Sequence, residues 1–144
     1  MLKRSLLFTF SAIVVVLTGC GTLESGKRYR QVRLEDLKTA YLVTPANANL
    51  TVSRHIGETL QRRGVMVRVG PTDPNPTNVD FVVTYTDRWN WDLKMYLESL
   101  QINFLDATNQ EPIASGSYHQ GVFHGYPDLE KTVQAVIESI YSAK

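Results

Sequence analysis

Residues 79–120 read VDFVVTYTDRWNWDLKMYLESLQINFLDATNQEPIASGSYHQ, and their pattern indicates the central strands of the protein. It contains three β-prone runs, at 79–87, 93–106 and 112–120, which are separated by polar or turn-forming residues. In the first run apolar residues alternate with more polar ones, which is the period of a half-buried strand. The second and third runs are joined by DATNQ, a sequence typical of a hairpin turn. Together the three runs predict a three-stranded meander.

The second run changes the phase of its apolar residues near Glu98 and Ser99. Because successive side chains of a strand point to opposite faces, this change predicts either a β-bulge there or a strand that is covered on both faces. The apolar residues before the change are Leu93, Met95 and Leu97, and those after it are Leu100, Ile102 and Phe104.

The segments on either side of the meander supply the remaining elements. Residues 40–44 and 65–69 are short β-prone runs, and residues 50–63 between them carry apolar residues at helical spacing before Gly64, a typical C-terminal stop. A last helix is expected after Pro127 and Asp128, with one apolar stripe. This order predicts an α/β (α+β) fold, a two-layer sandwich with a mainly antiparallel sheet and two helices on one face.

Composition limits the possible functions. The 144 residues, of which 43% are hydrophobic and 20% charged, suit one compact domain plus a short extra segment. A formal charge of +1 gives no basic surface for a nucleic acid, so DNA and RNA binding are disfavoured. The single cysteine, Cys20, excludes an intramolecular disulfide and a multi-cysteine metal cluster. No cofactor-binding motif is found.

The first twenty residues carry the most specific signal. Lys3 and Arg4 precede an uncharged apolar run at 6–17, the pattern of a secretory signal peptide. A run of about twelve residues is shorter than the roughly twenty that a membrane-spanning helix needs. The run ends in LTGC at residues 17–20, and this tetrapeptide resembles the lipobox of the bacterial prolipoprotein family.

The resemblance implies a thioether-linked diacylglycerol on Cys20, cleavage between Gly19 and Cys20, and acylation such as palmitoylation of the new amino terminus. In this family an Asp after the lipidated cysteine commonly directs retention at the inner membrane, and this chain has Gly21 there. We therefore expect an outer-membrane, periplasm-facing lipoprotein, with the inner membrane as the alternative. The predicted organisation is a signal peptide at 1–19, a lipidated tether at 20–33 and one domain at 34–144.

Two tryptophans mark the most distinctive stretch of the mature chain. Trp89 and Trp91 stand next to Arg88 in the RWNWD sequence, where they could stack on a sugar ring or grip a peptide. The alternative, which we favour, is that both indoles pack at the hairpin between the two longest strands. If one of them is exposed, it is the best candidate for a ligand contact.

The histidines are a second set of candidates. His119 and His124, with His55 or a carboxylate, could form a metal site or the acid–base pair of a small hydrolase. Their spacing matches no compact pair of metal ligands, so we expect these histidines to be solvated or hydrogen-bonded instead. Arginines at positions 54, 62 and 63 could meet anionic headgroups, although basic residues on a polar helix face usually face solvent.

The mature domain resembles a broad group of small uncharacterised envelope lipoproteins, through VVTYTDRWNWDLKMYL and INFLDATNQEPIASGSY. The sequence has no catalytic motif. We therefore expect a non-enzymatic lipoprotein, anchored through Cys20, that binds or supports an envelope protein or a cell-wall component, through a sheet edge or the Trp89/Trp91 region. A periplasm-facing hydrolase using a His/carboxylate site is the main alternative, and a purely structural spacer is a third.

Overall fold

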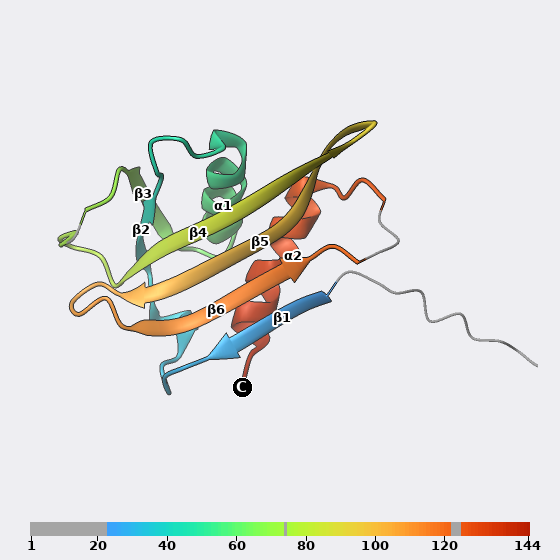
Figure 1. The fold of residues 1–144 in the computed structure, drawn as a ribbon. Coiled ribbons are helices and arrows are strands. Elements are labelled where there is room, and N and C mark those ends of the chain that lie inside the picture. The colour runs from blue at the N-terminus through green and yellow to red at the C-terminus, as the bar shows by residue number, and fades with distance from the viewer. Residues whose placement is uncertain (1–22, 74, 122–124) are drawn as a thin grey trace, which may run out of the picture.

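A computed structural model describes residues 23–73, 75–121 and 125–144 of the chain. It is a two-layer structure in which a six-stranded sheet is covered on one face by two helices (Figure 1). The sheet order is β1-β6-β5-β4-β2-β3. The elements are β1 (Leu23–Arg28), a short 3-10 helix (Leu34–Asp36), β2 (Thr39–Val43), α1 (Leu50–Arg62), β3 (Met66–Gly70), β4 (Phe81–Asp92), β5 (Lys94–Asp106), β6 (Pro112–His119) and α2 (Leu129–Ser142).

The predicted fold class is confirmed. Strands β4, β5 and β6 form the expected antiparallel meander. Strand β2 lies parallel to both β3 and β4, because α1 carries the chain back across the sheet between β2 and β3. The sheet is therefore mixed, with one parallel corner at β3-β2-β4.

Both helices begin where side chains can accept hydrogen bonds from free backbone N–H groups. Asn49 caps α1 by accepting from the Thr51 N–H, and Asp128 caps α2 by accepting from the Lys131 N–H. The apolar stripe of each helix packs on the sheet in one core, where the rings of Phe81 and Phe104 lie 4.9 Å apart. The fully buried helical residues include Val52, Ile56, Leu60, Val133, Val136, Ile137 and Ile140.

Of the two explanations for the apolar phase change, the β-bulge is the correct one. Arg88 pairs with Ser99, whereas the next residue of β4, Trp89, pairs with Leu97, so Glu98 is the extra residue. The bulge returns the apolar residues on both sides of it to the helix-covered face. Strand β4 runs to Asp92, five residues further than expected, and the β4–β5 hairpin projects past the ends of the neighbouring strands (Figure 1).

The expected tether at 20–33 is wrong in its central part. Residues 23–28 form β1, an edge strand that pairs antiparallel with β6. Arg28 donates from its guanidinium to the Ile140 and Tyr141 carbonyls at the end of α2, at 3.4 and 3.5 Å, and to the Val32 carbonyl at 2.6 Å. The domain thus includes residues well before position 34. The polar edge strand LESGKR has no apolar periodicity by which the sequence could predict it.

Several predictions from the amino-terminal segment lie outside the described residues. These are the signal peptide, the cleavage site at Gly19 and the lipidated residue Cys20, and His124 lies outside them as well. Within the described part of the chain, neither helix has the length and apolarity that crossing a bilayer requires.

Candidate functional site

The two tryptophans have different environments. Trp89 is partly buried against the core, and its indole N–H donates to the Asp87 carboxylate at 2.5 Å. Trp91 lies two residues further along β4, on the same face, but beyond the area that the helices cover, and 67% of its surface is exposed. The expectation that both indoles pack is therefore correct for Trp89 and wrong for Trp91. Arg88 forms an ion pair with Glu98, the bulged residue, at 3.5 Å.

Trp91 belongs to an apolar group at the end of the hairpin, which we call the hairpin tip and define as Trp91, Leu93 and Met95. Trp91 and Met95 are directly opposed across the strands, and Leu93 alone connects them between the paired residues Asp92 and Lys94. Leu93 is 88% exposed and Met95 55% exposed. Clusters of exposed large apolar side chains mark interaction surfaces more often than isolated ones do.

Leu93 has a φ of 36°, outside the regions that residues with a branched side chain ordinarily adopt. A Gly or Asn would fit this turn with less strain. The stability of the fold therefore gives no reason for an exposed leucine at this strained position. The apolar pattern places Leu93 and Met95 on one strand face but does not predict their exposure, because it does not show where the helix layer ends.

The segment after β6 contacts the base of the hairpin tip. The Lys94 ammonium lies over the Tyr126 ring, 4.0 Å from its centroid, and the Tyr126 and Tyr96 rings meet edge to face at 6.3 Å. The Tyr126 hydroxyl donates to the Asp92 carbonyl at 3.5 Å. These contacts hold the hairpin in one orientation relative to the domain.

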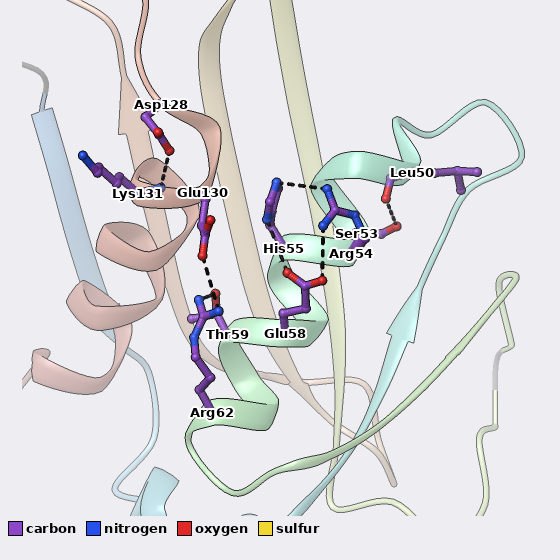
Figure 2. Close-up of polar contacts among 10 residues, drawn as sticks. All are labelled: Leu50, Ser53, Arg54, His55, Glu58, Thr59, Arg62, Asp128, Glu130 and Lys131. Carbon is purple, nitrogen blue, oxygen red and sulfur yellow. Dashed lines mark hydrogen bonds and ion pairs between the residues drawn. The ribbon is translucent and has the colours of Figure 1, made fainter.

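The two histidines that the structure describes lie on different elements, His55 on α1 and His119 on β6. His119 is exposed at the end of β6, opposite Ser99, and among the described residues no carboxylate is within ion-pair distance of it. His55 lies on α1 beside Glu58, with Nδ1 3.5 Å from Oε2, and its Nε2 is 3.4 Å from the Arg54 guanidinium (Figure 2). Within the described ranges, no group of three potential ligands among His, Cys, Asp and Glu could hold a metal ion.

The arginines of α1 pair with acids. Arg54 contacts Glu58 on the same helix at 3.2 Å, and Arg62 bridges to Glu130 on α2 at 3.4 Å and donates to the Thr59 hydroxyl at 3.0 Å (Figure 2). Their charges are thus partly neutralised within the domain. Arg63 pairs with Glu138 and stacks on the Tyr141 ring, 4.2 Å from its centroid. These contacts favour a structural role for Arg62 and Arg63, which connect α1 to α2.

A second apolar surface lies where α1 meets the edge strand β3. This groove has a volume of about 350 Å³, and we call it the α1/β3 groove. Its rim includes Leu50, which is 70% exposed, and Val69, which is 55% exposed. Strand β3 is the last strand of the described sheet and pairs with β2 alone, so its outer edge presents unpaired backbone groups. The lining residues are Leu50, Ser53, Arg54, Gly57, Glu58, Gln61, Val67 and Val69.

The carboxylate of Asp80 is held by hydrogen bonds at the start of β4. Asp80 accepts from the Lys38 N–H at 2.7 Å, and from the backbone N–H and hydroxyl of Thr39 at 2.8 and 2.9 Å. Partial burial alone would raise the pKa of Asp80, but these hydrogen bonds together lower it below its ordinary value. Asp80 therefore joins the start of β4 to the chain entering β2, a structural role.

No protein-family model matches the chain, and no curated protein matches it significantly. Solved structures do resemble it. A PelC dodecamer from Paraburkholderia phytofirmans superposes with a TM-score of 0.60 at 13% identity, over 85% of this chain and 99% of that one. A DUF4136 family protein from Bacteroides thetaiotaomicron gives 0.52 at 9% identity, over 83% of this chain and 94% of that one.

A PDZ domain protein from Parabacteroides distasonis gives a TM-score of 0.51 at 11% identity, over 82% of this chain and only 35% of that one. At identities this low the likeness concerns the backbone arrangement and transfers no site residue. The chain therefore shares its α+β fold with small bacterial domains from several sources.

Proposed function

We propose that this chain is a non-enzymatic lipoprotein of the bacterial cell envelope, anchored through lipid on Cys20 in the outer membrane and facing the periplasm, whose domain binds another envelope protein. The observation that carries the binding role is the α1/β3 groove beside the open edge of β3. An extended segment can add to such an edge through backbone hydrogen bonds, and the apolar groove gives its side chains somewhere to pack.

Two further points support the proposal. The LTGC sequence follows a charged start and an apolar run, as lipidation at Cys20 requires. A solved structure of the same fold is a dodecamer, so this backbone arrangement is compatible with protein–protein assembly. The proposal assigns no catalytic residue.

Site-specific photo-crosslinking tests the binding role. A photoreactive residue placed at Leu50, on the groove rim, should crosslink to an envelope protein in intact cells. Adding Val69→Lys should abolish that adduct, because a charge in the apolar groove opposes docking and strand addition. The matched control is Gln101→Lys, an exposed position on the other face of the sheet, which should leave the adduct unchanged. An adduct that persists with Val69→Lys would contradict the binding role.

The anchor is tested separately by mass spectrometry of the amino-terminal peptide. We expect diacylglycerol on Cys20 and loss of membrane association in a Cys20→Ser variant. A wild-type chain that carries no lipid would refute the anchoring proposal, whatever the crosslinking result.

A further inference from the structure

The hairpin tip and the start of β1 lie at the same end of the sheet. Leu23 pairs with His119, and His119 on its other side pairs with Ser99 of β5. From Ser99 the β4–β5 hairpin continues to Lys94 and the turn at Leu93. Figure 1 shows the hairpin projecting beyond the end of the sheet from which β1 starts.

The distance that the hairpin extends can be compared with the distance that Cys20, the expected lipid attachment point, can reach. Ser99 pairs with Arg88 and Lys94 with Asp92, four residues further along β4, so at about 3.3 Å per residue the tip extends roughly 13 Å beyond the level of Leu23. Cys20 precedes Leu23 by three residues, which cover at most about 11 Å when fully extended. Even if residues 20–22 were fully extended, Cys20 would not lie further out than the hairpin tip along the strand direction.

The side chains at the tip suit the interface of a bilayer. Trp91 is amphipathic and prefers the headgroup level, and Leu93 and Met95 are apolar and exposed. Within residues 88–98, Arg88 and Lys94 are balanced by Asp92 and Glu98, so this outer part of the hairpin has no net charge to draw it to an acidic protein or to anionic lipid. Its attraction would be hydrophobic.

We propose that the hairpin tip inserts into the interface of the same bilayer that holds the lipid of Cys20, as a second point of attachment. This inference rests on the proposed function, because the geometry starts from a lipidated Cys20. A second contact beside the lipid fixes the orientation of the domain on the bilayer. The strained φ of Leu93 then has a purpose, since a polar turn residue would fit the backbone better but would not enter the membrane.

Depth-dependent fluorescence quenching tests the proposal. The chain has two tryptophans, so Trp89→Phe leaves Trp91 as the sole reporter and Trp91→Phe leaves Trp89 as the matched control. Each purified full-length lipidated variant is reconstituted into phosphatidylcholine vesicles with brominated acyl chains. We expect strong quenching and a blue shift for the Trp91 reporter, insensitive to salt, and little quenching for the Trp89 reporter.

A further variant pair measures the energetic consequence. In the Trp89→Phe background, Leu93→Asn should weaken the tip contact and reduce quenching of Trp91, because burial of a leucine side chain contributes about tenfold to a partition equilibrium. Gln101→Asn, on the open sheet face, should change nothing. Circular dichroism confirms that each variant is folded.

The outcomes distinguish this inference from the proposed function. If mass spectrometry shows lipid on Cys20 but Trp91 is not quenched, the inference is overturned and the anchor stands. If Trp91 is shielded only in native envelopes and not in vesicles, the tip contacts a protein and the bilayer contact is again rejected. If the chain carries no lipid, both proposals fail.

Discussion

Substituting Gly26 tests whether β1 is part of the domain. A Cβ at this position would lie 1.9 Å from the carbonyl oxygen of Ser139 and 3.1 Å from the Ile140 nitrogen. Both are backbone atoms of α2, which buried side chains such as Ile137 and Ile140 hold on the sheet. The helix cannot move aside without disturbing the core, so the strain must be relieved by displacing β1.

We expect Gly26→Ala to lower the free energy of unfolding by about 2–4 kcal/mol. Overpacking typically costs about 1–3 kcal/mol, and displacing β1 also weakens the Arg28 contacts with the last carbonyls of α2, each worth about 1 kcal/mol. Against a total stability of about 5–15 kcal/mol this is a large loss. Urea denaturation followed by far-ultraviolet circular dichroism measures it, and hydrogen exchange should show faster exchange in β1 and β6.

Gly57→Ala is the matched control. Its Cβ would meet only Leu42 Cδ2, at 3.9 Å, in the interior of α1. The higher helix propensity of alanine should raise the free energy of unfolding by about 0.5–1 kcal/mol. Surface substitutions usually change the free energy of unfolding by no more than about 0.5 kcal/mol. If Gly26→Ala changes it by no more than that, the close approach of α2 to β1 is refuted.

Three further changes are predicted. Leu93→Asn should leave the midpoint of thermal unfolding unchanged or raise it, since asparagine tolerates a positive φ better than leucine; a clear fall would contradict the strain at this turn. Because its folded-state pKa is lowered, Asp80 contributes stability that is present above its ordinary pKa of 3.8 and lost as the pH falls through the folded value. The stability gap between the unaltered chain and Asp80→Asn, measured by urea denaturation, should therefore narrow below about pH 4, and a gap independent of pH would contradict this. Arg28→Met should lower the free energy of unfolding by about 1–3 kcal/mol, because the α2 carbonyls lose a charged donor, whereas Lys27→Met, on exposed β1, should change it little.

The sequence predicts the fold well where apolar periodicity is strong. The meander and both helices follow from the spacing of apolar residues. The phase change near Glu98 left two explanations, a bulge or a strand covered on both faces, and the structure shows the bulge. The N-terminal limit of α2 also follows, since Asp128 is a good cap. In these elements burial follows the spacing of residues that are close in sequence, so the sequence predicts which side chains are buried.

The candidate site is predicted less completely. RWNWD lies on the hairpin that carries the exposed apolar side chains, yet the sequence alone does not separate the partly buried Trp89 from the exposed Trp91. Both lie in phase on one strand face, and the difference is that the helices cover one and end before the other. The α1/β3 groove likewise joins residues from two elements whose packing no local pattern specifies.

The sequence alone predicts the order of the elements from β2 to α2, and its LTGC tetrapeptide is the basis for expecting lipid on Cys20. The tertiary structure adds that residues 23–28 form a strand and that this strand starts at the same end of the sheet as the hairpin tip. A polar edge strand is held by backbone pairing and by small residues beneath a helix, and neither leaves a hydrophobic period in the sequence. Pairing between distant segments fixes where a strand lies in the sheet, whereas apolar periodicity indicates only which face of a helix or strand is buried. The place of β1 could therefore not be predicted from periodicity.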